Sequence, residues 1–196
     1  MLGPHDPLPP AASRILIAGT SGSGKTTLAG RLSETLGIPH HEMDNLHWGA
    51  GWTTRESFLE DVAAFVATEA WVSEFQYREV RPLTAGRAQV MVWLDYPVRT
   101  RMWRVLRRTL RRRFRREPMW DVGLLEPPLW TILRNPDHIV RFAWRTRKNF
   151  DGLPAALAEK YPHLTLVRLR SPREARQWLD GVALAASHDR PEGVGS

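Results

Sequence analysis

Short apolar runs alternate with longer amphipathic segments along most of the chain. The runs have the length of buried strands, and the segments between them repeat apolar residues at helical spacing. This pattern predicts strands over residues 14–18, 39–43, 70–72, 89–94 and 164–169, and helices over 26–36, 55–68, 98–113, 137–150, 153–160 and 172–186. Strands that alternate with helices favour a parallel sheet covered by helices on both faces, which is an α/β fold.

The two ends of the chain lack this alternation. Residues 1–12 are rich in proline, and residues 187–196 are polar and contain glycine. We therefore expect disordered tails over 1–12 and 187–196, on either side of one domain that spans residues 13–186.

The most specific motif follows the first predicted strand. Residues 19–26, GTSGSGKT, match G-x-x-x-x-G-K-[ST] and open the first predicted helix. Glycines let successive backbone N–H groups converge on one anion, and the helix N-terminus adds a partial positive charge. We expect ATP to bind here, with Lys25 at its β and γ phosphates and the Thr26 hydroxyl on Mg²⁺. The residues expected to bind the nucleotide are Gly19, Gly22, Ser23, Gly24, Lys25, Thr26 and Thr27.

Length and composition narrow the class of protein. With 196 residues the chain has little room for the additional domains of large ATPases, and it contains no N-K-x-D stretch of the kind that guanine-specific GTPases use. It has no cysteine, which excludes disulfides and thiolate metal sites. No apolar stretch is long enough to span a bilayer and no signal-peptide pattern begins the sequence, so we expect a cytoplasmic protein without membrane contact, a monomer or a homodimer.

Three segments together resemble a known family. They are IAGTSGSGKTTLAGRLSETLGIPHHEMDNLHWGAGW, WVSEFQY and VWLDYPVRTRMWRVLRRTLRR. They are similar to the adenylate-kinase-like P-loop proteins often named topology modulation proteins, and the resemblance extends from about Arg14 to Leu179. It implies a three-layer P-loop NTPase fold with a five-stranded parallel sheet in the order 2-3-1-4-5, a mobile substrate arm, and a helical lid at about residues 112–130.

The resemblance also implies roles for residues near the third strand. Glu74 falls where adenylate kinases carry the aspartate of their D-G-F-P-R segment, and Arg78 falls where they carry the arginine that binds the acceptor phosphate. Glu74 is thus a candidate to support Mg²⁺, and Arg78 a candidate to bind the acceptor; a solvated surface arginine is the alternative for Arg78. Asp95, which follows the apolar run at 90–94, is the second choice to Glu74 for the metal.

Asp44 is the candidate for the acceptor hydroxyl. It follows the second predicted strand, and ligands of open α/β sheets bind at such strand ends. A carboxylate there can orient or deprotonate an acceptor hydroxyl, or hold a magnesium-bound water; the alternative is a turn-forming role, because Asp44-Asn45 is a turn-like pair. Trp48 and Trp52 either form an aromatic wall for a planar acceptor or bury the arm against the sheet.

Positive charge is concentrated in one helix. Ten arginines and no acidic residue lie from Arg99 to Arg116. The net charge of the chain is +7, so the residues outside this segment sum to a charge of −3. Apolar residues recur there every four positions, which leaves a separate cationic stripe on the same helix. Because the helix follows the fourth strand, we expect Arg104 and Arg108 to reach the phosphates and stabilise the charge of a transferring phosphoryl group.

Three functions remain open from the sequence. The first is a kinase that transfers the γ-phosphate of Mg-ATP to a small acceptor, such as a nucleotide or nucleoside. The second is a nucleic-acid-associated ATPase that uses Arg111–Arg116 for non-specific phosphate contacts. The third is an ATP-binding regulatory protein without catalysis.

Overall fold

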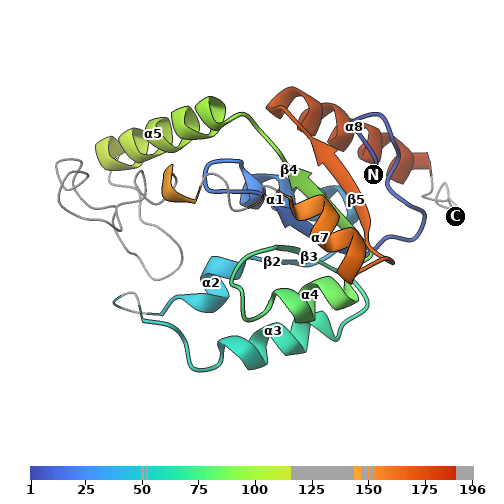
Figure 1. Cartoon of the computed structure of the whole chain (residues 1–196), viewed down its shortest axis with the longest axis horizontal. Helices are drawn as coiled ribbons and strands as arrows, with labels where there is room; N and C mark the ends of the chain where they lie inside the picture. The colour runs from blue at the N-terminus through green and yellow to red at the C-terminus, as the bar shows by residue number, and fades with distance from the viewer. Residues whose placement is uncertain (50, 52, 116–143, 147–149, 151, 189–196) are drawn as a thin grey trace, which may run out of the picture.

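Five parallel strands form one sheet at the centre of the molecule (Figure 1). The computed structural model describes residues 1–49, 51, 53–115, 144–146, 150 and 152–188. The strands are β1 (Arg14–Ala18), β2 (His40–His41), β3 (Trp71–Glu74), β4 (Val90–Leu94) and β5 (Thr165–Leu169). Their order is β2-β3-β1-β4-β5, which confirms the α/β fold and the strand order that the resemblance implied.

Helices cover both faces of this sheet and make the fold three-layered (Figure 1). They are α1 (Lys25–Leu36), α2 (Met43–His47), α3 (Phe58–Val66), α4 (Arg81–Arg87), α5 (Val98–Arg115), α7 (Leu153–Lys160) and α8 (Pro172–His188). Alternate residues of each strand point to opposite faces, so the sheet divides the apolar core in two.

Each half of the core is filled from different helices. Ile15 and Ile17 of β1 pack in the half that contains Leu32 of α1 and Trp178 of α8. Leu16 and Ala18, the residues next to them in sequence, pack in the half formed with α3, α4 and α7. The central strands β1 and β4 are thus almost entirely buried between helices, which explains why they read as continuous apolar runs in the sequence.

The parallel arrangement brings the functional segments to one edge of the sheet. In the register of the strands, Ile17 lies opposite Glu74 on one side and Val92 on the other, so β1, β3 and β4 end close together. The loop that carries the GTSGSGKT motif, residues 19–26, is called the phosphate loop below. It leaves β1 at this edge, α2 follows β2, and α5 follows β4 (Figure 1).

Several element boundaries differ from the sequence prediction. The second strand ends at His41 instead of residue 43, because Met43 is fully buried and its backbone N–H binds the Glu74 side chain as α2 begins. Helices α2 and α4 were not predicted, and both are short. Residues 112–115 of the predicted lid continue α5, and its residues 116–130 lie outside the described residues, as does most of the predicted helix at 137–150.

The first residues of the chain pack against the sheet. Leu2 forms a parallel bridge with Val167 of β5, in which its N–H donates to Leu166 O at 2.7 Å and its carbonyl accepts from Arg168 N at 2.9 Å. Leu2, Leu8 and Ala12 also contact the core. The sequence predicted a disordered tail over 1–12; instead, these contacts fill the hydrogen-bonding positions that β5 presents on its outer side.

Candidate active site

The phosphate loop requires glycine at positions that contact α5. Gly22 and Gly24 have positive φ angles of 80° and 93°, a region that glycine adopts without steric cost. A Cβ atom on Gly22 would lie 2.6 Å from the Arg101 carbonyl oxygen, and one on Gly24 would lie 2.7 Å from Arg104 Nη2. The loop is therefore closely covered by α5, and its glycines allow that approach.

The loop also holds polar groups suited to an anion. Helix α1 begins at Lys25, so its first backbone N–H groups lie at the loop. Ser23 is buried, and its Oγ has no hydrogen-bond partner among the residues that the structure describes. Thr26 and Thr27 are exposed at the start of α1. A cradle of N–H groups with an unpaired buried hydroxyl fits the phosphates of a nucleotide.

Charges from several elements converge on Lys25. Burial lowers the pKa of Lys25, the carboxylates of Asp44 and Glu74 act in the opposite direction, and Arg108 and Arg81 lower it further. These interactions place α2, β3, α4 and α5 around the same ammonium group. The predicted residues Lys25, Asp44, Glu74 and Arg108 are thus brought together at the edge of the sheet.

Asp44 lies in the first turn of α2, held by the segment that follows β3. Its Oδ1 accepts a hydrogen bond from Tyr77 Oη at 2.6 Å and another from Gln76 Nε2 at 3.0 Å. The predicted carboxylate is therefore fixed in place and lies within electrostatic reach of Lys25. The sequence pattern did not predict a role for Gln76 or Tyr77. The only signal for these two residues in the sequence is that they follow a predicted strand.

Glu74 is buried at the end of β3, with only 1% of its surface exposed. Its Oε2 accepts the Met43 N–H at 2.9 Å, and its Oε1 lies 3.3 Å from His40 Nε2. Burial alone would raise the pKa of Glu74, but these two hydrogen bonds and the charges of His40 and Lys25 lower it overall. The carboxylate thus ties β2 and α2 to β3, and its role toward a metal remains a prediction.

The arginines of α5 divide between two sides of the helix. Arg101 Nη1 donates a hydrogen bond to Thr20 Oγ1 of the phosphate loop, and Arg104 contacts Gly24 as described above and lies over the Tyr96 ring at 6.0 Å. Arg99, Arg107 and Arg111 are exposed instead. The side chains of Arg112–Arg116 lie outside the described part of the chain, and the expected nucleic-acid contact at Arg111–Arg116 stays a prediction.

Two arginines lie near the start of α4, and Arg78, the one predicted to bind the acceptor, is the more exposed. Arg78 is exposed, whereas Arg81 is half-buried, with its guanidinium carbon 4.9 Å from the Phe75 ring centre and 5.5 Å from that of Phe150. Arg81 also acts on the pKa of Lys25, and its Nε is buried without a partner among the described residues. Sequence reasoning missed Arg81; Pro82, a residue favoured in the first turn of a helix, was the available signal.

The remaining candidates lie around this centre. Asp95 Oδ2 accepts hydrogen bonds from Arg168 Nε at 2.9 Å and Nη2 at 2.5 Å, so this carboxylate is paired with β5. The Trp48 ring packs edge-on against His47, with centres 4.5 Å apart, and its backbone pairs with Thr54. Trp52 lies outside the described residues.

Within the described ranges, no group of three histidine or acidic side chains is close enough to hold a metal ion. In the same ranges, no helix has the length and apolarity to cross a membrane.

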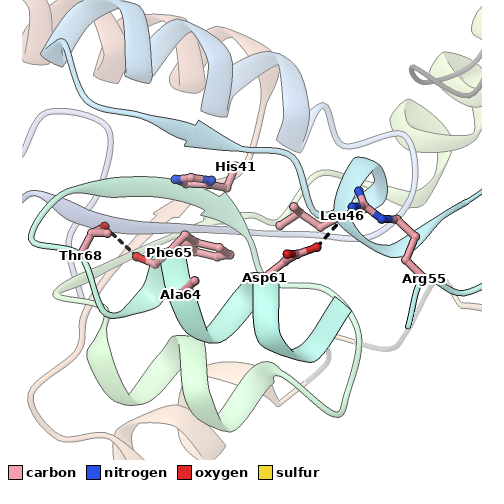
Figure 2. A pocket seen from close by; sticks show the side chains of 7 residues that line it. All are labelled: His41, Leu46, Arg55, Asp61, Ala64, Phe65 and Thr68. Carbon is pink, nitrogen blue, oxygen red and sulfur yellow. Dashed lines mark hydrogen bonds and ion pairs between the residues drawn. The ribbon is translucent and has the colours of Figure 1, made fainter. Parts of the chain in front are cut away.

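An open depression of about 460 Å³ lies beside β2, the outermost strand on one side of the sheet (Figure 2). His41 stacks on Phe65 of α3 at 4.4 Å, and Arg55 pairs with Asp61 at 3.5 Å. Its lining residues are His41, Leu46, Arg55, Asp61, Ala64, Phe65 and Thr68. None of the candidates around Lys25 lines it, so the depression is distinct from the phosphate site.

Comparison with known proteins gives structural likeness only. No protein-family model matches the sequence, and no curated protein matches it. Among solved structures, a shikimate kinase from Acinetobacter baumannii in complex with shikimate aligns with a TM-score of 0.53 and 16% identity, covering 92% of this chain and 96% of that one. A gluconokinase from Sinorhizobium meliloti 1021 aligns with a TM-score of 0.50 and 18% identity, covering 90% and 95%. The chain therefore has the fold of these kinases over almost their full length.

Proposed function

We propose that this protein is a kinase that transfers the γ-phosphoryl group of Mg-ATP to a hydroxyl group of a small acceptor. One observation carries the proposal: Asp44 lies within electrostatic reach of Lys25. Lys25 belongs to a loop that has the G-x-x-x-x-G-K-[ST] sequence and leads directly into helix α1. A phosphate-binding loop alone fits any nucleotide-binding protein. A fixed carboxylate beside it supplies what transfer to a hydroxyl additionally needs.

The proposed reaction assigns a role to each group. The loop residues and Lys25 bind the β and γ phosphates, and Thr26 would hold the Mg²⁺, which would neutralise part of their charge. The acceptor oxygen forms a bond to the γ-phosphorus as the bond from that phosphorus to the β,γ-bridging oxygen breaks, and ADP leaves. Asp44 takes the proton of the acceptor hydroxyl. Arg104 and Arg108 stabilise the charge on the transferring group from α5.

The acceptor proposed here is small and anionic. Arg81 supports this choice, because its half-buried guanidinium lies near Lys25 and its Nε has no partner among the described residues, so it can pair with a phosphate or carboxylate. Nucleoside monophosphates, shikimate and gluconate all carry such a group. The cytoplasmic location and the monomeric or dimeric state expected from the sequence remain predictions.

Phosphorus NMR of Mg-ATP with AMP, shikimate, D-gluconate or a pooled metabolite extract tests the proposal. With the native protein we expect ADP and a new phosphoester signal, from a phosphorylated hydroxyl of shikimate, of D-gluconate or of the AMP ribose, and with Lys25→Ala we expect no new phosphoester. Formation of ADP alone from AMP would mean transfer to its phosphate and would contradict a hydroxyl acceptor. Lys160→Ala is the matched control, because Lys160 is exposed at the end of α7 and should leave turnover unchanged. ATP binding without any acceptor-dependent turnover would favour the regulatory function instead.

The second candidate function is a nucleic-acid-associated ATPase, and it rests on the exposed side of α5. Arg99, Trp103, Arg107 and Arg111 recur every four residues on its exposed side, and Trp103 is 64% exposed. Cationic and aromatic side chains together suit single-stranded nucleic acid. Retention on single-stranded DNA that falls steeply with salt, and falls further in Arg99→Gln/Arg107→Gln, would support it; unchanged retention in that variant would exclude this surface.

A further inference from the structure

Tyr77 is held in an unusual backbone conformation directly after β3. Its φ angle of 47° is positive, which only one other described non-glycine residue, Ala11, shares. Such a conformation costs about 1–3 kcal/mol and persists only where surrounding contacts impose it. The Tyr77 ring stacks on His47 with centres 3.8 Å apart and planes inclined by 6°, and the Phe58 ring meets it edge-on at 5.4 Å. The ring therefore has a defined place between α2 and α3.

This placement directs the Tyr77 hydroxyl at Asp44. The 2.6 Å hydrogen bond to Oδ1 is the shorter of the two that Asp44 accepts, and Gln76 supplies the other to the same oxygen. Burial and the charge and hydrogen bond of Asp44 raise the pKa of Tyr77, while a hydrogen bond with the Trp48 side chain acts in the opposite direction. The raised pKa favours the protonated phenol, the form that donates the hydrogen bond to Asp44.

We propose that Tyr77, with Gln76, is a positioning residue that fixes the Asp44 carboxylate through Oδ1, so that Oδ2 faces the acceptor and receives its proton. This inference rests on the proposed kinase function. Both donors bind one oxygen, so they define the rotation of the carboxylate as well as its location. A carboxylate that is free to rotate would present the wrong geometry for part of the time, and small misplacements reduce rates strongly.

The alternative is that Tyr77 serves packing alone. Its ring would then matter and its hydroxyl would not, because the stacking on His47 and Phe58 involves only ring atoms. Tyr77→Phe separates the two, since it keeps the ring and removes the hydrogen bond. Tyr161→Phe is the matched control: the same change at the end of α7, where the ring contacts His163.

The kinetic test measures kcat and KM for AMP, shikimate and D-gluconate, each with Mg-ATP. We expect Tyr77→Phe to lower kcat by about tenfold to a hundredfold while KM for ATP stays unchanged. Gln76→Leu should show a smaller loss of the same kind, and Tyr161→Phe none. In an Asp44→Asn background, Tyr77→Phe should cause no further loss, because the group that it positions is gone.

Three kinetic results would overturn the inference. The first is a native kcat in Tyr77→Phe. The second is a higher KM for the acceptor at unchanged kcat, which would mean that Tyr77 contacts the acceptor itself. The third is an equal loss in native and Asp44→Asn backgrounds, which would show that Tyr77 acts through the fold.

A spectroscopic test does not need an acceptor. In protein labelled with ¹³Cζ-tyrosine, the Tyr77 signal should not titrate up to pH 11, and it should titrate at lower pH in Asp44→Asn. Titration of Tyr77 near pH 10 in the native protein would show that the contact with Asp44 is absent in solution. If this contact is present but no acceptor is phosphorylated, the kinase function fails while the placement of Asp44 stands.

Discussion

Single residues of the phosphate loop combine two roles, because the backbone that would bind phosphate also contacts α5. Gly24 shows this most directly: its φ of 93° excludes most side chains, and the space where a Cβ would lie is occupied by Arg104. A substitution there thus disturbs the loop and an arginine proposed to act on the phosphates at the same time.

Gly24→Ala should weaken ATP binding by at least about tenfold and destabilise the fold by about 1–3 kcal/mol, because alanine is strained at this φ. Calorimetric titration with an ATP analogue and thermal unfolding measure the two effects. Gly86→Ala is the control: Gly86 lies in α4, where a Cβ would meet nothing within 4 Å, so alanine should stabilise this helix slightly. Native affinity in Gly24→Ala would contradict the proposed placement of the phosphates.

Arg81 and Arg78 allow a second comparison between single residues. Arg81→Met keeps much of the packing against Phe75 and Phe150 but removes the charge, and it should raise KM for an anionic acceptor by about tenfold to a hundredfold, the value of one charge-assisted hydrogen bond. Arg78→Met should change KM less than threefold, as expected for an exposed charge. The measurement is steady-state kinetics with AMP or shikimate, and the reverse ranking would restore Arg78 as the acceptor residue.

At the scale of elements, α5 is the helix whose two sides differ most in expected function. Arg104 and Arg108 face the phosphate loop and Lys25, whereas Arg107, between them in sequence, is exposed. One helical turn therefore supplies both the test positions and their control.

Arg104→Met and Arg108→Met should each lower kcat by about 10²-fold or more, the usual loss when one group that stabilises transition-state charge is removed. Arg107→Met should leave kcat within twofold. Single-turnover measurements with Mg-ATP separate this effect from product release. Equal kcat values in all three variants would mean that α5 contributes charge without contacting the phosphates.

The elements that the sequence predicts well are those with a strong local signal. The runs at 14–18 and 90–94 are buried on both sides and read as strands, and the phosphate motif locates the turn between β1 and α1. The short helices α2 and α4 were missed because neither is long enough to show an apolar period. Gln76, Tyr77 and Arg81 were missed for a related reason: their contacts with Asp44 and Phe150 join segments far apart in sequence.

Across the whole molecule, the buried Glu74 links three elements and connects the candidate site to stability. Because its pKa in the folded protein is lowered from the ordinary value of 4.5, ionised Glu74 stabilises the fold above about pH 4.5. This contribution is lost as the pH falls through the lowered folded pKa. The sheet edge that holds Asp44 should loosen under the same conditions.

Glu74→Gln should therefore reduce the free energy of unfolding at pH 7 by about 1–3 kcal/mol, the usual result of disturbing a charged hydrogen-bond network. The difference from the native protein should shrink as the pH falls below 4.5. Urea unfolding at pH 7 and at pH 3.5 measures both values. Glu69→Gln is the control, because Glu69 is 91% exposed in its ion pair with Arg14 and should change stability little. A difference that is constant with pH would contradict the assigned ionisation.

The pairing of Leu2 with β5 also matters to anyone who handles this protein. A chain cut at residue 13 would keep the whole phosphate site but leave the outer side of β5 open to other chains, which is a common origin of aggregation. A purification tag joined closely to Met1 would crowd the same strand.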